Sequence, residues 1–194
     1  LDADAEDRPA TLFGGDTDYA FGGFGGLGVM YTRFAGMDAV SVCGEGAVII
    51  DHALTLGGGG CGVTRLAKAQ NFGDAIYDSD QRMAFGYGGA IGRYHFFSRK
   101  VVNLSVGTLI GAGALTVGTR KPDADRGDMS LEDTRDDAVF VLEPQVGGYA
   151  NLTRWLRVGA SVGYRFVAGV DFAGVKSSDL AGPSAGLQIQ AGWF

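Results

Sequence analysis

Apolar and polar residues alternate along much of this chain, and the alternation is clearest over residues 185–194. The apolar residues of this segment share one parity, whereas Gly186, Gln188, Gln190 and Gly192 share the other. A period of two is that of a β-strand whose two faces meet different surroundings. Counting such segments between turn-like clusters predicts about eight strands, with centres near Leu27, Gly44, Gly58, Gly88, Gly111, Gly147, Gly163 and Ile189.

Short and long connections alternate between these predicted strands. Three tight turns are predicted at 51–53, 98–100 and 153–155. Three longer connections alternate with them, at 67–81, 119–137 and 171–182. An up-and-down barrel with short turns at one end and long loops at the other has this arrangement. The fold-class prediction is an all-β, up-and-down antiparallel transmembrane β-barrel over residues 19–194, preceded by an acidic N-terminal segment at 1–18.

Side-chain size follows parity within individual strands. Over residues 157–168 the large apolar residues share one face, and Arg157, Arg165, glycine and serine share the other. Over residues 83–92 Phe85 and Tyr87 oppose a row of alanine and glycine. The interior of a small barrel is narrow, so we expect the large residues to face lipid and the small ones to face inward. A soluble lipocalin-like barrel, which would reverse this orientation, is the alternative.

Composition narrows the class of protein further. The chain has 34 glycines and 4 prolines, and its apolar runs are too short for a membrane-spanning helix, so a membrane-spanning form must be a barrel. The formal charge of −6 argues against a nucleic-acid partner. Because the chain starts at Leu1 without a signal sequence, we expect that an export signal has been removed.

Aromatic residues gather near the predicted strand ends. Two aromatic girdles are expected where a barrel meets the two bilayer interfaces, and aromatic plugs of a soluble barrel are the alternative. The girdle at the short-turn end is predicted to contain Tyr19, Phe21, Phe96, Phe97, Trp155, Trp193 and Phe194. The girdle at the long-loop end is predicted to contain Tyr31, Phe34, Phe85, Phe140, Phe166 and Phe172.

Cys43 and Cys61 flank the tight turn at His52 symmetrically. In that hairpin register the two cysteines lie directly opposite each other on the inward face, while Val48 pairs with Leu56 on the outward face. We predict a cross-strand disulfide formed in an oxidising compartment. Two free buried thiols are the alternative.

A second group of residues comprises charged and amide side chains that are predicted to face inward: Glu45, Glu143, Arg157, Arg165, Gln188 and Gln190. Gln145 and Asn151 are predicted to lie beside them. A charge inside a narrow barrel must be paired or hydrated, so we expect Glu45 or Glu143 to form an ion pair with Arg165. This group would act either as a gate in a small water path or as a static polar plug, and the plug is favoured.

The most charged stretch of the chain lies between residues 120 and 137 and includes Asp123, Asp125, Arg126 and Asp128. It could display an Arg-Gly-Asp tripeptide for adhesion or bind a divalent cation, although its aspartate spacing misses the calcium-loop pattern. A solvated acidic loop is the favoured interpretation.

Catalytic and cofactor chemistry has little support in the sequence. The only histidines are His52 and His95, both near the short-turn end, and His95 with Ser98 would sit at a turn rather than in a pocket. The glycine-rich runs lack the Gly-Lys-Ser/Thr ending of a phosphate loop. We therefore predict neither an enzyme nor a cofactor or metal site.

With its repeated parity, alternating loop lengths and terminal Trp193-Phe194, the chain resembles the small eight-stranded outer-membrane barrels of the OmpA transmembrane domain, OmpX and opacity-protein families. The resemblance implies residence in the bacterial outer membrane, contact with lipid and lipopolysaccharide, and assembly by the outer-membrane insertion machinery. Functions in these families range from structural anchoring to adhesion. One departure is that Trp193, not Phe194, is in phase with the apolar face.

Three functional hypotheses follow from this resemblance and from the interior residues. The first is a non-enzymatic outer-membrane barrel whose acidic surface loops have a structural or partner-binding role. The second is a narrow pore for ions or small solutes. The third is the soluble lipocalin-like ligand-binding barrel, with no membrane contact.

Overall fold

The structure, a computed structural model, describes residues 21–34, 37–63, 67–68, 81–122, 129–170 and 176–194. Within these residues the chain forms eight long strands, one two-residue strand and one single-turn helix. In chain order the elements are β1 (Phe21–Phe34), β2 (Met37–Ile50), β3 (Leu54–Val63), β4 (Ala67–Lys68), β5 (Gln81–Phe96), β6 (Val102–Pro122), β7 (Met129–Asn151), β8 (Leu156–Ala168), α1 (Ser177–Leu180) and β9 (Gly182–Trp193).

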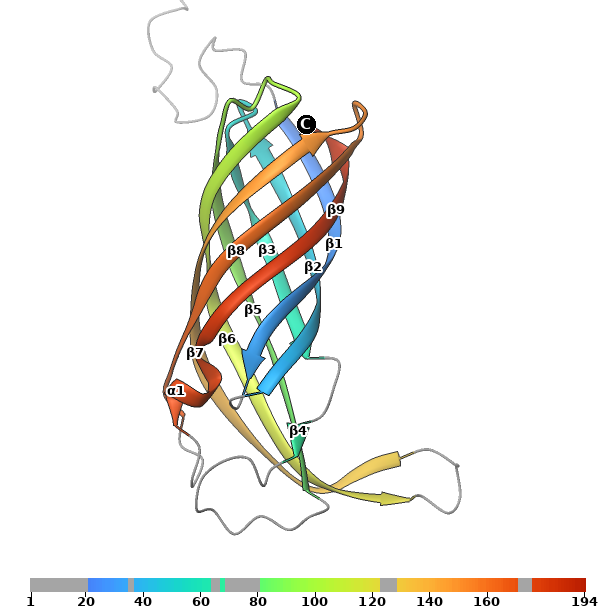
Figure 1. Cartoon of the computed structure of the whole chain (residues 1–194), viewed down its shortest axis with the longest axis vertical. Coiled ribbons are helices and arrows are strands. Elements are labelled where there is room, and N and C mark those ends of the chain that lie inside the picture. The colour runs from blue at the N-terminus through green and yellow to red at the C-terminus, as the bar shows by residue number, and fades with distance from the viewer. Residues whose placement is uncertain (1–20, 35–36, 64–66, 69–80, 123–128, 171–175) are drawn as a thin grey trace, which may run out of the picture.

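The long strands close into an up-and-down antiparallel barrel of tilted strands (Figure 1). Neighbours in sequence pair with one another, the β3–β5 pairing continues the wall past β4, and β1 pairs with β9. The predicted fold class is confirmed, and every predicted strand centre lies within a strand. The predicted N-terminal segment, 1–18, lies outside the described residues.

The three predicted tight turns are confirmed, and they lie at the barrel end that carries the C-terminal residue (Figure 1). Asp51 and His52 have φ angles of 50° and 55°, the positive values of a type I′ turn, within a three-residue connection between the register partners Ile50 and Leu54. The amide of Ala53 donates a hydrogen bond of 3.1 Å to the Ile50 carbonyl. This turn sets the register in which Cys43 faces Cys61.

At the opposite end the structure differs from the prediction of a long loop over 119–137. Strands β6 and β7 continue to Pro122 and Met129, so the hairpin that they form projects beyond the barrel wall (Figure 1). A register shift between Val117 and Thr119 interrupts the β6–β7 pairing where the projection begins, consistent with the bend that a β-bulge introduces. The charged, non-alternating sequence of this hairpin concealed its strands.

The helix α1 was not predicted and lies beside the long-loop end of the wall (Figure 1). Its Leu180 is fully buried in an apolar cluster with strand residues that face the interior. The cluster comprises Phe85, Tyr87, Ile91, Leu109, Leu115, Val139, Val141, Val167 and Leu180. Most of the side chains that fill the long-loop end of the lumen are therefore apolar.

Strand β5 has the opposite orientation to the predicted one. Phe85, Tyr87 and Ile91 face inward and are buried, whereas Ala84, Gly86, Gly88, Ala90 and Gly92 face outward. Glycines on the neighbouring strands make room for these inward rings. A Cβ at Gly113 of β6 would lie 3.1 Å from Phe85 and Tyr87 atoms, and a Cβ at Gly59 of β3 would lie 2.8 Å from the Ile91 Cδ1 atom. Large and small residues thus alternate around the lumen, so size alone does not identify the lipid face.

The outer wall is apolar along most other strands. Leu27 of β1, Leu187 and Ile189 of β9, and Val162 of β8 are exposed. On β8 the predicted parity holds, with Arg157 and Arg165 inward. Among the described residues, no helix is long and apolar enough to cross a membrane.

The inward position of Phe85 can be tested by truncation. We expect Phe85→Ala to lower the free energy of unfolding by about 3 kcal/mol, because it leaves a cavity in the packed interior. The matched control is Phe166→Ala, on an outward ring that is 50% exposed. Phe166→Ala should lower the free energy of unfolding by less than Phe85→Ala does, by a difference of about 1 kcal/mol or more, because lipid can fill the space that the outward ring leaves. Urea unfolding in lipid vesicles measures both, and equal costs would place Phe85 on the lipid face.

Candidate functional site

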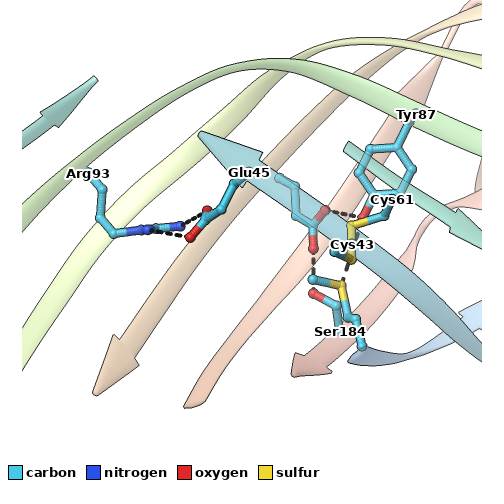
Figure 2. Close-up of a disulfide and its surroundings, with 8 residues drawn as sticks. Cys43, Glu45, Cys61, Tyr87, Arg93 and Ser184 are labelled. Atoms are coloured by element: carbon cyan, nitrogen blue, oxygen red, sulfur yellow. Dashed lines mark hydrogen bonds and ion pairs between the residues drawn. A yellow bond between two sulfur atoms is a disulfide. The ribbon is translucent and has the colours of Figure 1, made fainter. Parts of the chain in front are cut away.

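An ion pair spans the middle of the barrel interior. The Arg93 Nη2 atom of β5 lies 3.0 Å from the Glu45 Oε2 atom of β2, and Nη1 lies 3.5 Å from Oε1 (Figure 2). The two side chains are only 5% and 11% exposed. The Gln190 amide of β9 donates a 2.6 Å hydrogen bond to Glu45 Oε1. Residues from three strands therefore hold one carboxylate at the centre of the lumen.

Aromatic and cationic side chains fill the lumen between this pair and the short-turn end. The Tyr149 ring of β7 lies 5.6 Å from the Arg93 guanidinium carbon and 5.3 Å from the His95 ring. The Gln188 amide donates a hydrogen bond to the Tyr149 hydroxyl. The His95 Nδ1 atom lies 3.1 Å from the Asn103 Oδ1 atom. These contacts fill the part of the lumen near the short-turn end with aromatic rings.

Arg157 closes the short-turn mouth together with Phe194. Its Nε donates a 2.7 Å hydrogen bond to the Asn151 Oδ1 atom, and its guanidinium carbon lies 4.0 Å from the Phe194 ring centroid. The Phe194 ring also lies 5.8 Å from the buried Phe24 ring. Phe194 therefore lies on the inner side of the wall, and the prediction that it joins the outward girdle is wrong for this reason.

A buried carboxylate lies nearer the long-loop end. Glu143 of β7 accepts hydrogen bonds from the Tyr87 hydroxyl at 2.5 Å and from the Ser184 hydroxyl at 2.6 Å (Figure 2). Glu143 is fully buried. Two hydroxyl donors satisfy its two oxygens, so the carboxylate is held without a direct ion pair.

The predicted ion pair of Arg165 with Glu45 or Glu143 is wrong. The Arg165 Nε donates to the Leu180 carbonyl at 2.9 Å, and Nη2 donates to the Arg33 carbonyl at 3.1 Å. Its guanidinium carbon also lies within 5.3 Å of the Phe85 and Tyr87 ring centroids. Arg165 therefore connects β8 to α1 and to the end of β1, while Arg93 takes the predicted role beside Glu45.

The predicted disulfide is present. Cys43 and Cys61 are register partners with their Cα atoms 4.1 Å apart, and the bond faces the interior (Figure 2). A cavity of about 50 Å³ lies beside it, also lined by Met30, Glu45 and Gln188. That volume suits one or a few water molecules.

Arg93 and Tyr149 are two large polar interior side chains that the sequence interpretation missed. Arg93 and His95 share the parity of Phe85 in β5, and an arginine on the lipid face is expensive. Their charge and polarity were thus the signal that this face of β5 points inward. Tyr149 fits because Gly159 lies opposite it, where a Cβ would lie 2.5 Å from the ring.

The remaining predicted residues occupy varied positions. At the short-turn end the outward, exposed aromatic residues are Phe21, Phe96, Phe97, Trp155 and Trp193. At the long-loop end they are Tyr31, Phe140 and Phe166, whereas Phe85 is buried inside. Tyr19 and Phe172 lie outside the described residues, as do the loop residues Asp123, Asp125, Arg126 and Asp128.

The chemistry of the interior is that of a packed polar plug. Glu143, Arg165 and Gln190 are fully buried, and the Glu45 carboxylate is paired with Arg93. Within the described part of the chain, no group of three or more His, Cys, Asp or Glu side chains is placed to hold a metal ion.

The central ion pair predicts an asymmetry between single and double substitutions. Glu45→Gln should lower the free energy of unfolding by about 3 kcal/mol, because it leaves Arg93 charged and buried without a partner. Combining it with Arg93→Met should recover part of that loss. The exposed Arg33–Asp38 pair, 3.7 Å apart, is the control, and Arg33→Ala should cost less than about 1 kcal/mol. Additive losses in a double-mutant cycle would show that Glu45 and Arg93 are not coupled.

Comparison with known proteins supports the fold. No protein-family model matches the sequence, and no curated protein matches it. The structure of Neisserial surface protein A is similar, with a TM-score of 0.61 over 90% of this chain and 99% of that chain at 12% identity. The structure of Ail, the attachment invasion locus protein of Yersinia pestis, is also similar, with a TM-score of 0.50 over 89% of this chain and 97% of that chain at 12% identity. The closed eight-stranded wall and these neighbours give the chain the fold of the small bacterial outer-membrane β-barrels.

Proposed function

We propose that this chain is a non-enzymatic outer-membrane anchor whose long-loop end binds a partner outside the cell. The observation that carries the proposal is the β6–β7 hairpin. Its strands are 21 and 23 residues long, whereas the other barrel strands have between 10 and 16. The extra length projects past the wall at one end only (Figure 1). A strand that continues beyond the membrane-spanning wall is suited to contact something other than lipid.

The charge of the hairpin indicates the chemistry of the partner. Residues 119–137 contain seven acidic and four basic side chains. We infer a basic partner surface, because complementary charge steers association. The two similar structures are those of a neisserial surface protein and of an attachment invasion locus protein, and this chain would share the general role that these names describe.

The wall and its ends support the other contacts of an anchor. The apolar outer faces of β1, β8 and β9 would contact lipid, and lipopolysaccharide would meet the wall at the long-loop end. Exposed Phe21, Trp155 and Trp193 at one end, and Tyr31 and Phe166 at the other, would form the two aromatic girdles. The unfolded chain would be a substrate of the outer-membrane insertion machinery.

The filled interior favours an anchor over a pore. The Glu45–Arg93 pair, the Tyr149 ring and the apolar cluster occupy successive levels of the lumen. The cavity of about 50 Å³ is a chamber for water rather than a passage. An apolar outer wall does not fit the soluble lipocalin-like alternative, whose exterior must be wet.

Shortening the hairpin tests the proposed role. The variant replaces residues 118–134 with Asn-Gly, a sequence suited to a tight primed turn. In zwitterionic lipid nanodiscs at low salt, its affinity for polylysine should fall by about tenfold, because the deletion removes five acidic and three basic residues, a net loss of two negative charges. The control Asp2→Asn/Asp4→Asn/Asp7→Asn removes acidic charge elsewhere and should bind like the unaltered chain.

Two further measurements complete this test. Both variants should migrate differently before and after boiling on a gel, as folded barrels do. Undiminished polylysine binding by the shortened barrel would refute the role of the hairpin. Discrete conductance steps from the unaltered barrel in a planar bilayer would instead support the narrow pore.

A further inference from the structure

The disulfide lies on the inner face of the closed barrel, where both cysteines are half-buried. Both cysteines face the interior, and Cys61 packs against the apolar cluster. Toward the long-loop end, Phe85, Leu115 and Leu180 fill the lumen and are at most 2% exposed. On the other side lies the Glu45–Arg93 ion pair (Figure 2).

The space beside the sulfur atoms is small as well. The adjoining cavity is about 50 Å³, the volume of a few water molecules at most. Thiol–disulfide exchange requires the attacking sulfur to contact the sulfur that it attacks, through a mixed-disulfide intermediate. An oxidising protein would have to place its own sulfur and backbone in this cavity, which is far too small for them.

From this placement we infer that Cys43 and Cys61 are oxidised by a protein disulfide before the barrel closes, and that closure then shields their bond from exchange. One cysteine thiolate attacks a sulfur of the oxidising protein, which forms a mixed disulfide and releases one thiolate of that protein. The second cysteine thiolate then attacks the sulfur of the first and releases the other thiolate. The chain loses two electrons and two protons, and the oxidising protein is left as a dithiol.

The composition of the β2–β3 hairpin explains why an early bond is useful. Gly44 pairs with Gly60, Glu45 with Gly59, and Gly46 with Gly58. Glycine pairs have no side chains to lock one register, and a slip by two residues would leave every side chain on the same face. A bond between Cys43 and Cys61 fixes the single register before the neighbouring strands pair.

Reduction of the oxidised barrel is the first test. The oxidised chain, folded in detergent micelles, is treated with reduced thioredoxin and its free thiols are trapped with a maleimide. The same chain in urea is the reference. We expect reduction of the folded barrel to be slower by about a hundredfold or more, because exchange must wait for the wall to open.

Oxidation in the reverse order is the second test. The chain is refolded under reducing conditions, and oxidised protein disulfide isomerase is then added. We expect the folded barrel to keep both thiols, while the urea-unfolded chain forms the disulfide. The control is Asp51→Cys in a Cys43→Ser/Cys61→Ser background, which places one thiol at an exposed turn. That thiol should form the mixed disulfide in the folded barrel.

Two results would overturn the inference that the cysteines are oxidised before the barrel closes. Equal reduction rates for folded and urea-unfolded chains would overturn it, and so would rapid oxidation of the folded, reduced barrel by the isomerase. If the reduced chain does not fold, the thioredoxin experiment alone decides, since it starts from the oxidised barrel. None of these results depends on the partner proposed for the β6–β7 hairpin.

Discussion

The structure depends above all on the fixed width of a closed eight-stranded wall. Each large side chain that points inward needs an inward glycine near it, because the opposite wall cannot move away. Tyr149 lies over Gly159, and the Ile91 side chain lies against Gly59. The glycines of this chain are thus concentrated where rings fill the lumen, and also where β5 presents its small face outward. High glycine content here is a packing solution and not a sign of disorder.

The same packing determines how buried charged side chains are stabilised in the interior. A filled lumen leaves little water to solvate an ion, so each buried charge must find polar atoms on another strand. Glu45 does so with Arg93, and Glu143 does so with two hydroxyl groups. Arg165 instead donates to the carbonyls of Leu180 and Arg33. The polar groups therefore connect strands that are not neighbours in the wall. Apolar packing alone would fix the relative positions of these strands less specifically.

Sequence periodicity predicted those features that depend on one strand or one hairpin. The Cys43–Cys61 pairing followed from symmetry about a tight turn, and the inward parity of β8 followed from Arg157 and Arg165. The orientation of β5 was predicted wrongly because size was weighed and the charge of Arg93 was not. The partner of Arg165 lay beyond prediction, because contacts across the lumen depend on the stagger of all the strands together. The helix α1 is too short to show a helical period.

The filled lumen also constrains where this barrel can act. The Glu45–Arg93 ion pair, the Tyr149 ring and the apolar cluster fill successive levels of the lumen. In the described part of the chain the two rims differ, since one carries the three tight turns whereas the other carries α1 and the extended β6–β7 hairpin. Arg165 ties that second rim to the packed interior through α1 and β1. A packed interior that supports one elaborated rim suits the binding role proposed for that rim.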